Sequence, residues 1–298
     1  TKQYLDMLPV AAVNQTFGQV ITSDNNVISY SAPAKEGVAV PTEKELTDAL
    51  ETAKNADIKP LESAVSNEPL MDASVLKGSK IKKEEKGEFG STVFTLSNGI
   101  KVIVKPTDFK KDEIRIKTVA KGGTSFLPEE LLPSMERNVF SVYESNSGIY
   151  KFPQTQLNKM LTGKIASASY YIGTDRHGVN AYSSPNDLET AMQLLYLSYT
   201  EPRVEQQELE VGLSQLRALV PNLEKQPNFI FSVAIQQAIA NSPRNVKINS
   251  DLLEKVNAEN IKKALNILYG DAAGTTVIVT GNVDMNTFKP LMEKYIGS

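Results

Sequence analysis

The sequence predicts an α+β fold in which helices cover one face of a mostly antiparallel sheet. Runs of strand-forming residues flank the Asn98-Gly99 dipeptide, and several segments with helical spacing follow them. The two ends of the chain are also alike, because each predicts a helix, a strand and a second helix. This separation is far longer than any solenoid period. We therefore expect the chain to begin near the end of one module and to contain a complete second one.

The amino end predicts the shorter of these two modules. Helices are expected over Val10–Gln19 and Glu43–Ala53, with a strand over Val27–Tyr30 between them. The pair Val27-Ile28 stands where Val277-Ile278 stands at the carboxyl end. The other strands of this first sheet would precede the chain, and an unpaired apolar edge seeks a partner. We therefore expect the strand to pair with a neighbouring molecule or to pack against the second module, with Leu46 and Leu50 covering it.

A connector is predicted between the modules, from Asp57 to about Gly90. This stretch contains Pro60, Pro69 and Gly78 among charged and small residues, and it has no sustained period of 2 or 3.6 residues. The expected organisation is thus the end of a module over residues 1–55, a connector over 56–90 and a complete module over 91–298.

Strands open the second module. Residues 91–106 contain two β-rich runs around Asn98-Gly99, a dipeptide that favours a type I′ hairpin turn. Glu113–Ala120 alternates apolar and charged residues, which predicts a strand with one face in water. The pair Gly122-Gly123 is expected to end it.

Helices follow. Ser184 is expected to cap one of them, with Pro185 in its first turn and Asp187 completing a capping box. The apolar positions of this helix share one face, and those of the next do the same, with Pro221 near its end. These positions are Leu188, Met192, Leu195 and Tyr199, followed by Leu209, Leu213, Leu216 and Val220.

Three further elements complete the predicted module. Phe229–Ala240 is apolar nearly all round, which predicts a helix buried on most sides. A capped helix over Asn257–Tyr269, a strand over Thr275–Thr280 and a helix over Met285–Tyr295 end the chain.

Composition excludes several classes of function. The formal net charge of the 298 residues is -3, which does not suggest a nucleic-acid partner. The chain has no cysteine, so disulfides, zinc-thiolate sites and thiol nucleophiles are excluded. No apolar run approaches the roughly 20 residues that cross a bilayer.

A family resemblance rests on four parts of the second module. They are residues 94–114, the turn Gly122-Gly123-Thr124-Ser125, the stretch Leu161–Ala168, and residues 183–197 with Glu201-Pro202-Arg203. These parts resemble the pitrilysin-type zinc metallopeptidases, or inverse zincins, and especially their bacterial envelope members. Residues 8–53 resemble the end of the family's second module. The resemblance implies a pitrilysin-like module, in a protein whose two halves enclose a peptide, and a location in the periplasm or cell envelope of a bacterium.

The resemblance also implies where zinc chemistry would take place. The family's zinc site is His-x-x-Glu-His on one helix with a distal Glu, because two imidazoles one turn apart can share a metal. The equivalent stretch here, Pro128–Phe140, has no histidine, and Glu208–Val220 has only scattered acids. The single histidine, His177, lies in what reads as a polar turn, 175–178. We therefore assign no catalytic, cofactor-binding or metal-binding residue, and expect zinc in a missing amino-terminal module.

Other catalytic constellations are weaker. A serine triad would need His177 as its base, and no Gly-x-Ser-x-Gly elbow is present. The adjacent carboxylates of Glu129 and Glu130 would point apart on a helix. No phosphate-binding Gly-x-x-x-x-Gly-Lys loop occurs, and Gly122–Ser125 is interpreted as a structural turn.

Three functions remain open. The first is a non-catalytic portion of a zinc metalloendopeptidase, whose partners would be the amino-terminal half of the same protein and peptide substrates. The second is a wholly non-catalytic relative that acts as a scaffold or assembly protein. The third is an enzyme in its own right, with a site near His177.

Overall fold

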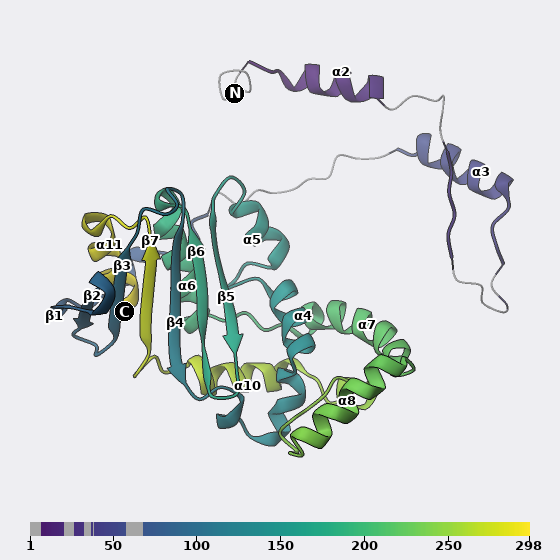
Figure 1. The fold of residues 1–298 in the computed structure, drawn as a ribbon. Coiled ribbons are helices and arrows are strands. Elements are labelled where there is room, and N and C mark those ends of the chain that lie inside the picture. The colour runs from purple at the N-terminus through teal and green to yellow at the C-terminus, as the bar shows by residue number, and fades with distance from the viewer. Residues whose placement is uncertain (1–6, 21–26, 33–36, 38, 58–67) are drawn as a thin grey trace. The chain divides into compact units, whose positions relative to one another are not determined.

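The computed structural model describes residues 7–20, 27–32, 37, 39–57 and 68–298. The chain divides into two compact units, residues 1–63 and 64–298, and each is considered by itself (Figure 1). No helix in the described ranges is long and apolar enough to cross a membrane.

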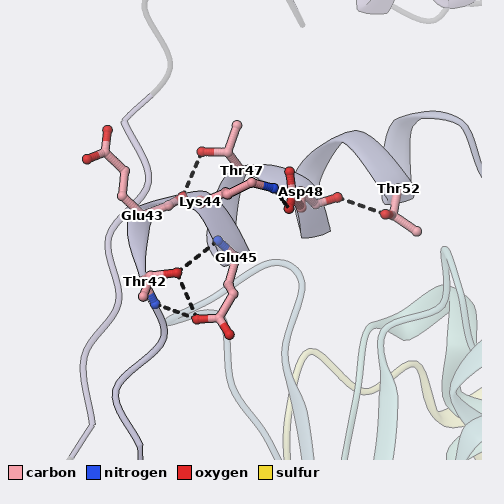
Figure 2. A network of polar contacts seen from close by, with 7 residues as sticks. All are labelled: Thr42, Glu43, Lys44, Glu45, Thr47, Asp48 and Thr52. Carbon is pink, nitrogen blue, oxygen red and sulfur yellow. Dashed lines mark hydrogen bonds and ion pairs between the residues drawn. The ribbon is translucent and has the colours of Figure 1, made fainter.

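The first unit contains the two helices that the sequence predicts. Helix α2 spans Val10–Val20 and helix α3 spans Glu43–Lys54. Figure 2 shows why α3 begins where it does: the backbone N–H of Thr42 donates to Glu45 Oε2 at 2.7 Å, and the N–H of Glu45 donates to Thr42 Oγ1 at 3.3 Å. This reciprocal capping box satisfies two N–H groups that an uncapped helix leaves free.

The predicted strand at Val27–Tyr30 is wrong. Residues 27–32 have no regular secondary structure, and the side chain of Val27 is 91% exposed. A strand exists only when a neighbour accepts and donates its backbone hydrogen bonds, and none of the described strands pairs with these residues.

The second unit is built on a seven-stranded sheet with the order β1-β2-β3-β7-β4-β6-β5. Neighbouring strands are antiparallel except β3 and β7, which are parallel. This arrangement confirms the predicted α+β class. The strands are β1 Ile81–Lys86, β2 Thr92–Leu96, β3 Lys101–Pro106, β4 Ile114–Lys121, β5 Ala166–Ile172, β6 Arg176–Ser183 and β7 Thr276–Gly281.

Three of these strands are not apparent from the sequence. Strand β1 lies in the predicted connector and joins the edge of the sheet, with Glu84 opposite Phe94. Strands β5 and β6 contain many small and polar residues, which do not alternate clearly with apolar ones. Their pairing with each other and with β4, rather than a local pattern, makes them strands.

The β2–β3 hairpin is confirmed, but its turn is not type I′. A type I′ turn needs positive φ at both central residues, and Gly99, with φ 89°, is the turn residue that has it. The backbone N–H of Gly99 donates to Leu96 O, and that of Leu96 donates to Ile100 O, so the loop is one residue longer. Asn98 instead donates through Nδ2 to the carbonyls of Ile296 and Gly297, which attaches the turn to the carboxyl end.

Helices cover one face of the sheet. Helices α6, Leu188–Thr200, and α10, Ala258–Tyr269, lie behind the strands in the view of Figure 1. The core lies between these layers. The other helices are α4 Arg137–Ser147, α5 Gln154–Met160, α7 Gln206–Leu223, α8 Pro227–Ile239, α9 Ser250–Leu253 and α11 Met285–Leu291, with a π turn at Met292–Ile296 and short 3-10 turns at 73–75, 88–90, 124–126, 129–135 and 185–187.

The predicted start of α6 at Ser184 and the predicted end of α7 near Pro221 agree with the structure, with small differences. Ser184 Oγ accepts the N–H of Asp187 as expected. The Asp187 carboxylate, however, accepts the N–H of Ile165 rather than that of Ser184, so the capping box is incomplete. Helix α7 continues two residues past Pro221.

Helix α8 departs most from expectation, because it is not buried. None of its residues is buried, and the side chains of Phe231 and Ile239 are 66% and 81% exposed. An apolar composition shows that a helix could be buried on most sides, whereas burial itself requires other elements to cover it.

Candidate functional site

The stretch Pro128–Phe140, which the resemblance aligns with the family's zinc helix, forms a structural corner. Residues Glu129–Met135 are a 3-10 turn that buries Leu131 and Leu132, and α4 follows. The carboxylate of Glu136 caps α4 by accepting the N–H groups of Asn138 and Val139 at 2.8 and 3.3 Å. The Glu136 carboxylate therefore serves as the N-cap of α4.

The two glutamates of helix α7, Glu208 and Glu210, form ion pairs with arginines. Arg203 holds the carboxylate of Glu208 through two nitrogens, Nε at 3.1 Å and Nη2 at 2.8 Å. Arg217 holds Glu210 at 2.7 Å. Within the described ranges, no group of three or more His, Cys, Asp or Glu side chains could hold a metal ion.

His177 lies in strand β6, not in a polar turn, so that part of the prediction is wrong. Its side chain is only 4% exposed, and its ring packs edge-on against Tyr269 at 5.1 Å. Burial lowers the pKa of this imidazole, and a hydrogen bond with the backbone of Leu268 opposes the shift. Nδ1 is buried without a hydrogen-bond partner among the residues described. The neutral ring thus acts as a core side chain.

Tyrosines surround this histidine on the covered face of the sheet. Tyr170 and Tyr199 pack edge-on against Tyr269, with ring centroids 4.9 and 5.5 Å away. The hydroxyl of Tyr269 donates to Gly178 O at 3.0 Å, and that of Tyr199 lies 2.6 Å from Thr118 Oγ1. Burial raises the pKa of Tyr199 to about 12. These phenols stay protonated and hold the helices to the strands.

A pocket of about 910 Å³ opens beside this cluster, between α6, α10 and the sheet. Its floor is mainly apolar, with Met192, Leu195 and Val277, and its rim carries Glu201 and Lys262. The size is that of many ligand sites. Two of its lining residues, Tyr199 and Tyr269, have hydroxyls that are already hydrogen-bonded to the sheet, so both have a structural role here.

The turn Gly122–Ser125 also has a structural role. Gly123 has φ 88°, and a side chain there would meet Gly173 O at 2.2 Å. The N–H groups of Gly122, Thr124 and Ser125 donate to backbone carbonyls of residues 173–175. They are therefore not free to cradle a ligand.

The opposite face of the sheet is open. Outward side chains alternate with core ones along each strand, and in β4 the core positions Ile114 and Ile116 alternate with exposed Arg115 and Lys117. None of the outward positions of strands β2 to β7 is Asp or Glu. We call the following exposed or half-buried residues the basic face: Lys101, Lys105, Arg115, Lys117, Lys121 and Arg176.

Strand register brings these residues together. Lys105 and Arg115 both pair with Thr280 from opposite sides, and Lys121 lies directly across from Arg176. Arg115 is paired with Glu113 at 3.0 Å and Arg176 with Asp175 at 3.5 Å. Lys101, Lys105, Lys117 and Lys121 have no ion pair with any residue that the structure describes.

Two curated zinc proteases match this chain. It is 30% identical over 213 residues to a zinc protease PQQL-like of Arabidopsis thaliana, and 23% identical over 212 residues to a probable zinc protease PqqL of Haemophilus influenzae. The matches cover 70% and 69% of this chain but 20% and 22% of those proteins. No protein-family model matches the chain.

Solved structures show the same fold. The match to the periplasmic protease PqqL from Escherichia coli covers 87% of this chain and 28% of the PqqL chain, with a TM-score of 0.68 and 16% sequence identity. A mutant of the ferredoxin protease FusC, in complex with Arabidopsis ferredoxin, matches 99% of this chain and 33% of its own, with TM-score 0.64 and 15% identity. These matches relate this chain to one part of the pitrilysin-type zinc proteases, the inverse zincins, and the chain spans about one fifth of the length of its curated relatives.

Proposed function

We propose that this chain is a non-catalytic portion of a zinc-dependent metalloendopeptidase. One observation carries the proposal: the chain matches only about a fifth of the length of proteins named as zinc proteases. The stretch that the resemblance aligns with the family's zinc helix, Pro128–Phe140, also lacks histidine. Zinc and the His-x-x-Glu-His motif would then lie on another module of the parent protein. This chain would supply part of the wall around a peptide substrate.

The open sheet face suits this role. A wall needs a surface that is not filled by its own helices, and α6 and α10 lie on the other side of the strands (Figure 1). The FusC relative was solved with a bound protein, which supports a polypeptide as the substrate class. The periplasmic location of the PqqL relative supports the cell envelope of a bacterium as the location.

Metal analysis and peptide cleavage test the proposal. We expect the purified chain to contain no stoichiometric zinc and to cleave no peptide, because it cannot offer two imidazoles on one helix. About one zinc per chain after dialysis against a weak chelator would contradict this.

The parent protein separates this proposal from a scaffold role. We expect the parent to bind zinc and to lose cleavage when a histidine of its zinc motif is replaced, while its folding is retained. A parent without zinc and without peptidase activity would instead favour a scaffold or assembly protein.

A further inference from the structure

The basic face contrasts with the charge of the whole chain. The formal net charge is -3, yet the outward positions of strands β2 to β7 carry basic side chains and no acid. Like charges directly opposite each other across neighbouring strands destabilise a sheet, and Lys121 and Arg176 are opposite each other here. Asp175 offsets the charge of Arg176, whereas Lys121 has no ion pair among the described residues, so an anion bound beside Lys121 would stabilise this end of the sheet.

Apolar side chains lie between the basic ones. Ile103 on β3 lies opposite Ile278 on β7. On the other side of β7, Ile278 lies opposite Lys117 of β4, so the three side chains form one row across the sheet. The Nζ atom of Lys117 lies 4.7 Å from the ring centroid of Tyr171. Charged, aliphatic and aromatic groups therefore share one face of the sheet.

We propose that the basic face binds an acidic segment of a polypeptide in which carboxylates alternate with apolar side chains. The inference rests on the proposed function, because it takes the open face to be the surface that meets the substrate. Four lysines without an ion pair among the described residues, Lys101, Lys105, Lys117 and Lys121, supply the complementary charge. The half-buried isoleucines supply contacts for the apolar residues between the carboxylates.

Nucleic acid fits this face less well. Its backbone carries one charge per about 1.7 Å of duplex axis, a charge density that six basic side chains spread over three strands do not match. Its phosphates also have no apolar groups to cover Ile103 and Ile278 at the centre of the face.

Fluorescence anisotropy on the 298-residue chain tests the proposal. The probe is a labelled peptide that alternates glutamate with leucine and alanine. Two further probes are the same peptide with lysine for glutamate and a single-stranded oligothymidine. We expect the acidic peptide to bind, the basic one not to bind, and binding to weaken as salt is raised through the physiological range, where the screening length is about 8 Å.

A charge-deletion variant locates the binding. The double variant Lys101→Ala with Lys117→Ala should bind the acidic peptide about tenfold more weakly, because two contact charges are lost. The control removes two exposed lysines outside the sheet and the pocket, Lys225→Ala with Lys255→Ala, and should bind like the wild type. Unchanged melting temperatures of both variants will show that the folds are intact.

Three outcomes would overturn the inference. They are no binding of the acidic peptide, equal binding by the face variant and the wild type, and tighter binding of the oligothymidine, which would make this a nucleic-acid surface. Each concerns this chain alone and needs neither zinc nor cleavage. The inference can therefore fail while the proposed function stands, and a parent without zinc would refute the function without changing these binding results.

Discussion

At the scale of single residues, His177 shows how environment decides chemistry. It is the only histidine of the chain, and an exposed imidazole with a nearby acid could serve as a base or a metal ligand. Here it is buried against Tyr269, and Nδ1 lacks a hydrogen-bond partner among the described residues. Its contribution is therefore to packing.

Truncation of His177 tests this role. We expect His177→Ala to lower the free energy of unfolding by about 1–3 kcal/mol, because it leaves a cavity beside Tyr269. The matched control is Asp175→Ala, two residues earlier, whose side chain is 79% exposed. Urea denaturation measures both, and a cost within about 0.5 kcal/mol for His177→Ala would show that the ring is not packed.

The same residue should make stability depend on pH. The pKa of His177 in the folded chain lies below 6.5, the ordinary histidine value. The unfolded chain therefore takes up this proton first as the pH falls, so stability decreases as the pH falls below about 6.5. His177→Phe keeps an aromatic ring and removes the titration. The stability of the wild type relative to this variant should fall between pH 7 and 5 in urea titrations, and a constant difference would contradict the assignment.

At the scale of elements, a side chain of helix α4 covers the free edge of strand β5. The carboxylate of Glu144, on α4, accepts the backbone N–H of Tyr170 at the edge of the sheet. Burial raises the pKa of this carboxyl, and the hydrogen bond from Tyr170 opposes the shift. Covering a strand edge in this way prevents another chain from pairing with it.

Two substitutions at Glu144 separate the hydrogen bond from the charge. Glu144→Ala should lower the free energy of unfolding by about 1–3 kcal/mol, because the partly buried Tyr170 N–H loses its acceptor. Glu144→Gln keeps an amide oxygen at that position and should cost less. Hydrogen exchange at the Tyr170 amide should accelerate in the alanine variant alone, whereas equal exchange in all three proteins would show that the contact does not protect the edge.

At the scale of the whole molecule, the boundary between the two units is the feature to test. The boundary near residues 63 and 64 falls inside the predicted connector. Strand β1 pairs with β2, and Leu70 is buried in the second unit. The part of the connector after Leu70 therefore contributes to the fold of the second unit.

Limited proteolysis should reflect this division. We expect the first cut near the boundary between the units and a stable fragment that keeps Leu70 and β1, because the burial of Leu70 and the pairing of β1 protect that backbone. Mass spectrometry of the early products identifies the site. First cuts inside residues 91–298, with the amino-terminal segment still attached, would instead show that both units share one core.

The sequence by itself determined the fold class, the β2–β3 hairpin, the strand at the end of the chain and most helices with their caps. These features depend on local chemistry: the positive φ of Gly99, the side-chain cap of Ser184, and apolar residues at helical spacing. The resemblance carried by residues 94–114 and 183–203 also identified the family, and the missing histidines showed which zinc motif this chain cannot form.

Only the tertiary structure decided which elements are buried and which residues meet. Helix α8 has the apolar composition of a buried helix, yet none of its residues is buried. Val27–Tyr30 has the composition of a strand but no partner strand among those described. Strands β5 and β6 are strands because they pair with each other. The basic face has the same origin, since only strand register places Lys105 and Arg115 on either side of Thr280 and Lys121 opposite Arg176. Burial and pairing depend on what lies opposite a residue in space, and local composition carries no information about that.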